Sequence, residues 1–468
     1  MKSKILLALG MLSWATLTSA CSAPPNCPTC GTTRNGTVVA ITTMQVPQAS
    51  PYGKPFSVWD IVVHDPATRR LYVTDRSHAA IAVYDTKNDT PIGQVKGAPV
   101  SFVGSVCCEA DRTSNFNEAS GPNAVIVSPP PAGGTLGTLW VSDGDSTLKV
   151  FDLDKDTLPV AHNDGTAMQS FGTVRTGVPL VNIDDCARNT NLSNAPTPPG
   201  PCGDMRADEM SFDPDHKVLL VTNGDSATGP FVTLVDTTNP TCTNNSCVLA
   251  QFFFDGNADG SPCPAPAVSG VVQGAVRCRH GPAATNGLGG SVYNPITKKL
   301  LQSTPQVGPN PADGEITEID PVTFRVTNHF ALTGLGCQAA SVAIGPSQNL
   351  LVGCANREGE AFSPSTFIMN ASTGQIIKSI YDVGRVDEVW YNDGDKRFYL
   401  AARDEPNGSV LGIIDAVSNM WLFNAPTGGN AHGLAADPFN NHIYIPISPN
   451  ARCGRFSAEG CIAVYAAQ

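Results

Sequence analysis

Short apolar runs separated by turn residues recur along the whole chain. The phrase WDIVVHDPATRRLYVTD, which begins at Trp59, returns as ADEMSFDPDHKVLLVTN, VDEVWYNDGDKRFYLAA and AHGLAADPFNNHIYIPI. Each copy alternates apolar and polar positions on both sides of a turn rich in Asp, Asn and Pro, a pattern that predicts strand, turn and strand. A third apolar run follows, as in IAVYDT, LKVFDL, VTLVDT and LGIIDA, and usually a fourth.

Three looser copies bring the number of repeats to seven: PNAVIVSPPPAGGTLGTLWVSD, LGGSVYNPITKKLLQST and AASVAIGPSQNLLVGCA. Four short strands repeated seven times predict an all-β, seven-bladed β-propeller. The last copy reaches Gln468 after only three strands. We therefore expect residues 36–46, GTVVAITTMQV, to supply the missing outer strand and remove an open sheet edge. Residues 36–468 are then one domain.

The stretch LYVTDRSHAAIAVYDT resembles the YVTN-type repeat of bacterial envelope β-propellers. The superfamily includes lactonase-like enzymes, streptogramin lyase-like enzymes and proteins without a known activity. The resemblance therefore implies the fold and an envelope location, and it implies little about chemistry.

The N-terminal residues 1–20 have the pattern of an export signal. Lys2 and Lys4 precede the apolar run ILLALGML, which is too short to span a membrane. Cys21 after Thr18-Ser19-Ala20 resembles a bacterial lipoprotein signal, although Thr18 departs from the usual Leu. Lipidation of Cys21 and simple secretion both remain open. Residues 21–35 form a leader rich in Pro and Cys, and the predicted location is the periplasm or, through a lipid anchor, the outer membrane.

The 15 cysteines also favour export, because a reducing cytosol rarely contains so many. Setting Cys21 aside leaves an even number, which predicts disulfides between sequence neighbours. The expected pairs are Cys27–Cys30, Cys107–Cys108, Cys186–Cys202, Cys242–Cys247, Cys263–Cys278, Cys337–Cys354 and Cys453–Cys461. A redox dithiol is the alternative for Cys27 and Cys30.

A net charge of −12 narrows the class of ligand. Nucleic-acid surfaces need clustered Lys and Arg, so no nucleic-acid partner is expected. Cations and neutral small molecules are more natural ligands for such a chain than polyanions.

Three long inserts interrupt the first blades, near residues 96–121, 162–207 and 251–285. By blade topology they join an outer strand to the next inner strand, so all should lie over one face of the ring. We call this predicted cover the canopy. It contains six of the paired cysteines, and His280 could extend from it to the channel. Loops of this length are usually functional, although surface loops without a ligand are the alternative.

Counting five residues back from each turn marks the start of the seven inner strands, which line the central channel. These positions are Asp60, Asn123, Asp208, Gly289, Ala340, Asp387 and His432. Three carboxylates near one axis repel one another unless a cation, a proton or hydrogen bonds compensate. Glu209 and Glu388 follow two of them, and strand alternation predicts that these two side chains turn away from the channel.

A divalent cation, calcium or magnesium, would satisfy this ring. Asp60, Asp208 and Asp387 would be its charged ligands, with Asn123 as a neutral one. His432 would be a further ligand or a general base. The arrangement is similar in position to the metal site of gluconolactonase-type propellers and streptogramin B lyases. The competing interpretation is a channel whose polar residues are simply hydrated.

Two functional classes follow. The first is an exported propeller that binds a small ligand or an envelope protein at the canopy face and catalyses no assigned reaction. The second is a metal-dependent lactonase or lyase. The motifs of serine hydrolases, zincins and phosphate loops do not occur in the sequence, so those classes have no support.

Overall fold

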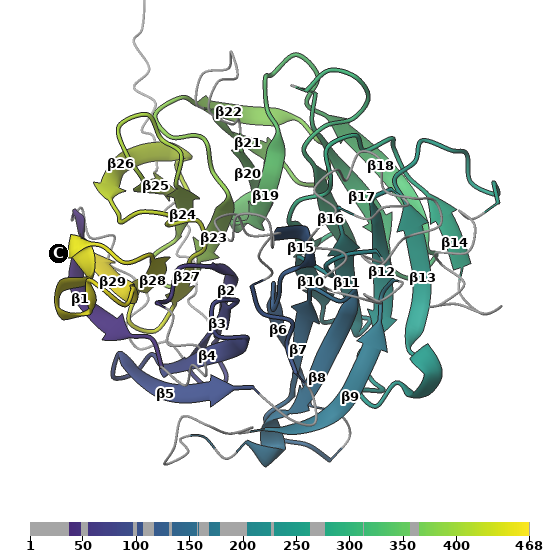
Figure 1. The fold of residues 1–468 in the computed structure, drawn as a ribbon. Helices are drawn as coiled ribbons and strands as arrows, with labels where there is room; N and C mark the ends of the chain where they lie inside the picture. The colour runs from purple at the N-terminus through teal and green to yellow at the C-terminus, as the bar shows by residue number, and fades with distance from the viewer. Residues whose placement is uncertain are drawn as a thin grey trace, which may run out of the picture.

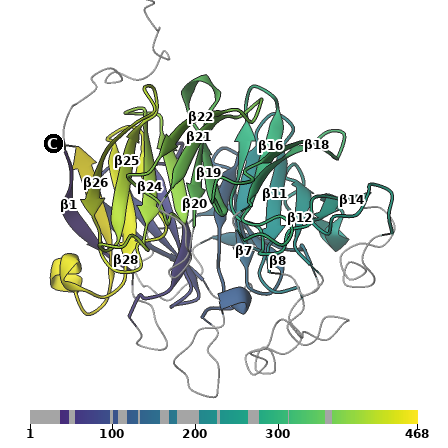
Figure 2. The ribbon, with the colours of Figure 1, turned by 90° about the horizontal axis from the view of Figure 1, so that it is seen from above.

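The strands form seven sheets arranged as blades around a central channel (Figure 1). The computed structural model describes residues 37–47, 55–96, 101–105, 117–130, 133–156, 158, 168–177, 204–225, 229–262, 277–311, 313–355 and 365–467. The ring is seen edge-on in Figure 2, with the blades side by side around it. This confirms the predicted all-β, seven-bladed propeller.

The first three blades follow one another in chain order. Blade 1 contains β2 (Trp59–Asp65), β3 (Arg70–Asp75), β4 (Ala80–Asp85) and β5 (Thr90–Val95). Blade 2 contains β6 (Val125–Ser128), β7 (Thr138–Asp143), β8 (Thr147–Asp152) and β9 (Gln169–Arg175). Blade 3 contains β10 (Met210–Asp213), β11 (Val218–Asn223), β12 (Phe231–Asp236), β13 (Val248–Phe253) and β14 (Arg277–His280).

The other four blades continue the same order. Blade 4 contains β15 (Ser291–Asn294), β16 (Lys299–Thr304), β17 (Glu315–Asp320) and β18 (Arg325–Ala331). Blade 5 contains β19 (Ala339–Ile344), β20 (Asn349–Cys354), β21 (Thr366–Asn370) and β22 (Ile376–Ile380). Blade 6 contains β23 (Glu388–Asn392), β24 (Arg397–Ala402), β25 (Val410–Asp415) and β26 (Met420–Pro426). Blade 7 contains β27 (Ala435–Asp437), β28 (His442–Ile447), β29 (Cys461–Ala467) and β1 (Val38–Gln45).

The repeated Asp-Pro turn explains why each inner strand folds back as a hairpin. The Asp65 carboxylate accepts hydrogen bonds from the backbone N–H groups of Ala67 and Thr68, at 3.1 and 3.2 Å. Arg69 then takes a positive φ of 54°, which turns the chain into β3. Asp and Asn stabilise such turns because their short side chains bond to backbone groups two or three residues on. Asn294 does the same in blade 4, where it accepts from Ile296 at 3.0 Å.

The core lies between neighbouring blades and not in the middle of the ring. Tyr72, Ile81 and Val83 of blade 1 belong to the same buried cluster as Leu139 and Val141 of blade 2. Each sheet therefore covers both of its faces with the adjacent blades. Removing one blade would expose two apolar faces, so the ring is stable only when it is closed.

The ring closes where the sequence predicts. Strand β1 pairs antiparallel with β29, from Val38 opposite Ala467 to Gln45 opposite Cys461. The purple N-terminal strand thus lies beside the yellow C-terminal strand in Figure 1. The Met44 side chain of β1 is buried with Trp59 of blade 1 and Ile462 of blade 7. The N-terminal strand is therefore part of the core of the closure.

Blade 3 differs from the prediction because it has a fifth strand. Strand β14, from the end of the third insert, pairs parallel with β13 at the outer edge of the blade. The strand has only four residues and pairs in parallel with a strand more than 20 residues earlier in the chain, so the sequence pattern missed it. Among the described residues, no helix is long and apolar enough to cross a membrane.

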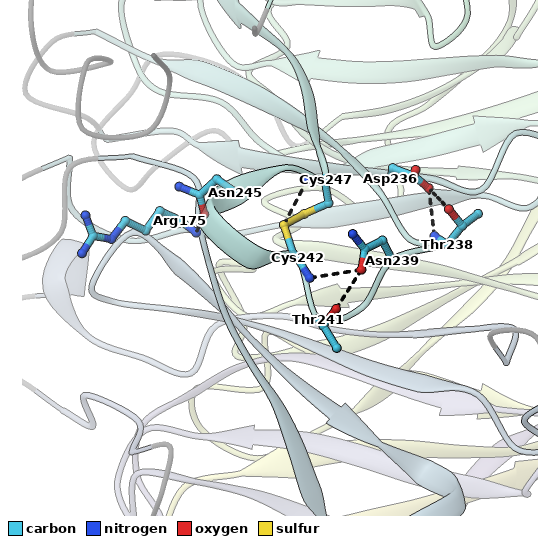
Figure 3. Close-up of a disulfide and its surroundings, with 8 residues drawn as sticks. All are labelled: Arg175, Asp236, Thr238, Asn239, Thr241, Cys242, Asn245 and Cys247. Carbon is cyan, nitrogen blue, oxygen red and sulfur yellow. Dashed lines mark hydrogen bonds between the residues drawn. A yellow bond between two sulfur atoms is a disulfide. The ribbon is translucent and has the colours of Figure 1, made fainter. Parts of the chain in front are cut away.

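One predicted disulfide closes the connection between β12 and β13. Cys242 and Cys247 are bonded, and their Cα atoms are 5.1 Å apart (Figure 3). The Asn239 side chain accepts from the Cys242 N–H at 3.4 Å, and the Asn245 side chain accepts from the Arg175 N–H of blade 2 at 3.0 Å. The bridge therefore holds a loop that also contacts the neighbouring blade.

Two further disulfides agree with the predicted pairs, Cys337–Cys354 in blade 5 and Cys453–Cys461 in blade 7. Cys278 is also disulfide-bonded, whereas Cys263 lies outside the described residues. The cysteines of the other three predicted pairs also lie outside the described residues: Cys27, Cys30, Cys107, Cys108, Cys186 and Cys202. The predicted signal, Cys21 and most of the canopy lie outside them as well.

Candidate ligand site in the central channel

The seven positions predicted to start the inner strands lie at or just before those strands. Neighbouring blades are hydrogen-bonded to one another near these positions. The Ile61 N–H of blade 1, for example, donates to the Asn123 carbonyl before blade 2 at 3.0 Å. The Gly290 N–H donates to the Ala340 carbonyl at 2.6 Å. A Cβ on Gly289 would lie 2.0 Å from that Ala340 oxygen, so only glycine fits at this approach. We call this end of the channel the mouth.

Asp60 and Asn123 share an arginine at the mouth. Arg76 pairs with the Asp60 carboxylate, and its Nε donates to Asn123 Oδ1 at 2.9 Å. The Asn123 amide donates in turn to the Ala207 carbonyl at 2.7 Å. The Arg76 side chain is almost fully buried, so its charge is compensated within the protein.

Asp208 pairs with a second arginine. Arg206 Nη2 lies 2.9 Å from Asp208 Oδ2 and 3.3 Å from Asp225, while Nη1 is 3.4 Å from Asp60. Burial raises the pKa of Asp208 to about 7, although the Arg206 charge acts in the opposite direction and Asp60 adds to the rise. Arg206 thus lies within 3.4 Å of three carboxylates, those of Asp60, Asp208 and Asp225.

Asp387 pairs with a third arginine, Arg403, at 3.0 Å. This pair is more open than the others, since about a third of each side chain is exposed. Arg76 and Arg403 occupy equivalent places, each directly after the second strand of its blade. That spacing is a sequence signal that could have identified them, but the sequence prediction drew only on the inner strands.

The charges that a metal was predicted to compensate are therefore each paired with an arginine. Among the described residues, no group of three or more His, Cys, Asp or Glu side chains has the arrangement of a metal site. Because the arginines already supply the charge, the ring does not require a metal. Calcium or magnesium at Asp60, Asn123, Asp208 and Asp387 stays a prediction.

His432 is held inside the wall of the mouth. Its ring stacks on Trp59, with centroids 5.0 Å apart and planes 14° apart. Nδ1 lies 2.7 Å from the Asn430 carbonyl, and Nε2 lies 3.2 Å from the Trp59 carbonyl. Burial lowers the pKa of His432, which favours the neutral ring, and a neutral imidazole can donate to only one of the two carbonyls. These contacts account for its position, and its predicted catalytic role stays a prediction.

His280 lies in β14, at the outer edge of blade 3 and away from the inner strands (Figure 1). Its Nδ1 is 3.0 Å from Asp255, and its Nε2 is 3.2 Å from the Ser261 carbonyl. Both ring nitrogens thus have partners in the turn 255–261. The described contacts of His280 are with the third insert and not with the mouth.

Beyond the mouth, the inner strands line a partly open cavity of about 300 Å³. Glu209 and Glu388 line it, so the expectation that these side chains turn away from the channel is wrong. The reason is the orientation of the blades. Each sheet stands radially, so strand alternation directs side chains toward one neighbouring blade or the other, and consecutive residues both border the channel.

The two glutamates are the acidic groups of the cavity. Ser341 Oγ donates to Glu388 at 3.0 Å. Among the described residues, no side chain forms a hydrogen bond or an ion pair with the Glu209 carboxyl. Burial raises the pKa of both groups well above the usual range, and in Glu209 the neighbouring Glu388 adds to the rise. A Cβ on Gly290 would lie 2.3 Å from Glu209 Oε2, so this glycine makes room for the carboxyl.

The comparisons with known proteins define the class of protein, a seven-bladed β-propeller, and nothing narrower. A chain of a solved structure titled "Crystal Structure of Mitotic Checkpoint Complex" is similar, with a TM-score of 0.53 and 11% identity, covering 99% of this chain and 100% of that one. At this identity the likeness shows the fold alone, and the 1266 solved chains that match indicate how widely the fold is shared. No protein-family model matches the sequence, and no curated protein matches it.

Proposed function

We propose that this protein is an exported β-propeller that binds a small ligand or an envelope protein at the channel mouth, with no reaction assigned. The observation that carries the proposal is the concentration of charged side chains there. Arg403, Asp387 and Asp225 keep between 31% and 36% of their side chains exposed while they pair at the mouth. Partly exposed, pre-positioned charges are suited to recognising a polar partner.

The described ends of the inserts support the same location. The Ser105 N–H donates to the Arg76 carbonyl at 2.8 Å, and the Arg206 N–H donates to the Glu118 carbonyl at 2.8 Å. Parts of the first and second inserts are therefore bonded to the residues that form the mouth. A canopy anchored in this way would add loop surface around the paired charges.

Export is part of the proposal and rests on the sequence. The signal-like residues 1–20, the 15 cysteines and the YVTN-like repeat all favour the bacterial envelope. The three disulfides formed by described cysteines fit an oxidising compartment. The mass of the mature N-terminus measures this directly, because lipidation at Cys21 adds acyl chains and simple secretion adds none.

Site-specific photo-crosslinking in an envelope extract tests the binding face. A crosslinking residue at Asp404 samples the mouth, and one at Asp393 samples the opposite end of the same blade; both carboxylates are at least half exposed. We expect discrete adducts from position 404 that weaken when Arg403→Glu is added. Equal adducts from both positions, or adducts insensitive to Arg403→Glu, would show that the mouth is not the binding face.

A further inference from the structure

The cavity beyond the mouth has walls of a mixed character. Apolar surface comes from four blades around the channel, through Ile61, Val62, Ile126, Met210 and Val342. Trp390 and Tyr391 add aromatic surface from blade 6. The polar groups are Glu209, Glu388, Ser291 and Ser341. An apolar chamber with a small acidic pole suits a compact ligand with an apolar body.

The acidic pole lacks a positive partner among the described residues. The three mouth arginines are each directed to an aspartate: Arg76 to Asp60, Arg206 to Asp208 and Arg403 to Asp387. In the described structure, none of them pairs with a glutamate of the cavity. Glu388 has only the neutral Ser341 hydroxyl, and Glu209 forms no described side-chain bond. Both residues are half-buried, and an ionised carboxyl that is partly removed from water without a partner is costly.

This charge pattern distinguishes the cavity from the mouth, where arginines of the protein compensate the charges of the aspartates. A cation that enters the cavity would meet two carboxyls and aromatic walls, the combination that favours ammonium groups with an apolar shell. A divalent metal is less well suited, since it needs six or more oxygen ligands and the walls are mainly apolar. The raised pKa values of both glutamates are the response expected of carboxyls without a counter-charge.

We propose that the channel cavity binds one small organic cation, a quaternary or alkyl ammonium, with Glu209 and Glu388 as its counter-charges. The apolar and aromatic walls would pack against its carbon atoms. This inference rests on the small-ligand form of the proposed function and names the class of ligand.

Calorimetry on the full mature chain tests it with four probes: choline, tetramethylammonium, butylammonium and 3,3-dimethyl-1-butanol, the uncharged analogue of choline. At least one ammonium probe should bind at a single site. Its affinity should exceed that of the uncharged analogue by about tenfold or more, equivalent to about 1.4 kcal/mol. Glu209→Gln keeps the shape but cannot ionise when a cation binds, and should weaken ammonium binding about tenfold while leaving the uncharged probe unaffected.

Glu388→Gln is the second variant, in case one substitution impairs folding, and Asp393→Asn on the opposite end of blade 6 is the matched control. The inference is overturned if no ammonium probe binds, or if the uncharged analogue binds equally well. It is also overturned if calcium or magnesium binds in a Glu209-dependent way and the ammonium probes do not. Crosslinking at Asp404 is independent of these variants, so a failure here leaves partner binding at the mouth standing.

Discussion

Arg206 and Asp208 form an ion pair of 2.9 Å at the mouth, two residues apart at the start of blade 3. The pair is not fully satisfied, because Arg206 Nε and Asp208 Oδ1 are buried without a hydrogen-bond partner in the described structure. Asp60 and Asp225 also lie within 3.4 Å of the same guanidinium. The arginine is thus the shared counter-charge of several carboxylates.

Replacing Arg206 with Gln should therefore destabilise the protein more than replacing Asp208 with Asn. Loss of the guanidinium leaves three carboxylates without this counter-charge, which should lower the free energy of unfolding by about 3–5 kcal/mol. Asp208→Asn removes one charge and keeps the shape, so its cost should be smaller. In the double variant the losses should not add, because the neutral amide introduced by Asp208→Asn no longer needs the cation. Chemical denaturation measures all three, and simple additivity would contradict a direct coupling.

The N-terminal strand offers a second prediction. Met44 is 2% exposed between blades 1 and 7, whereas Ile41 of the same strand is 42% exposed. Met44→Ala should lower the free energy of unfolding by about 2–5 kcal/mol. Ile41→Ala is the matched control and should change it by about 0.5 kcal/mol or less. Similar effects of the two truncations would mean that the strand is not docked in solution.

The repeat pattern of the sequence was sufficient to predict several features of the fold. The Asp-Pro turns recur in phase, so the blade count, the inner-strand positions and the closing strand followed from local pattern. The arginine partners of Asp60, Asp208 and Asp387 were not predicted, although each pair is local to one blade: Arg76 and Arg403 follow the second strand of the same hairpin, and Arg206 is two residues before Asp208. Pairing of Cys337 with Cys354 was predictable since the two residues flank one hairpin.

The position of Glu209 and Glu388 was predicted wrongly for a different reason. Alternation tells which of two sheet faces a side chain occupies. In a propeller both faces contact other blades, and the channel meets the edge of the inner strand instead. A rule that separates core from solvent in a layered protein therefore cannot separate channel from wall here. Strand β14 was missed because its pairing is parallel and non-local.

The disulfides allow a prediction about stability based on loop length. Cys337–Cys354 closes a separation of 17 residues, and Cys242–Cys247 closes one of 5. On the chain-entropy account, replacing the first pair with serines should cost about 3 kcal/mol and replacing the second about 2 kcal/mol. Denaturation of the two double variants under non-reducing conditions tests the order. A larger loss for the shorter loop would point to its contact with blade 2 through Asn245 and not to chain entropy.

Asp143 provides a test of pH dependence away from the cavity. It ends β7 in blade 2, is completely buried, and lies 3.5 Å from Lys149 Nζ. The Val103 N–H donates to its carboxylate at 3.2 Å. Burial and then the Asp145 charge raise the pKa of Asp143 to about 7, while Lys149 acts in the opposite direction. The native protein therefore favours the protonated carboxyl.

The sign of the effect follows from the two pKa values. The unfolded chain releases this proton near the ordinary pKa of 3.8, and the native state holds it up to a pKa of about 7. The contribution of Asp143 to stability is therefore complete below about pH 4 and is lost as the pH rises to about 7. Because a pKa displaced by one pH unit corresponds to about 1.4 kcal/mol, the loss should be on the order of a few kcal/mol. Asp143→Asn cannot titrate, so its free energy of unfolding relative to wild type should rise across this interval. Denaturation at several pH values measures that difference, and Asp393→Asn, at an exposed carboxylate, is the control. Parallel curves of unfolding free energy against pH for wild type and Asp143→Asn would show that the Asp143 carboxyl is already ionised in the native state.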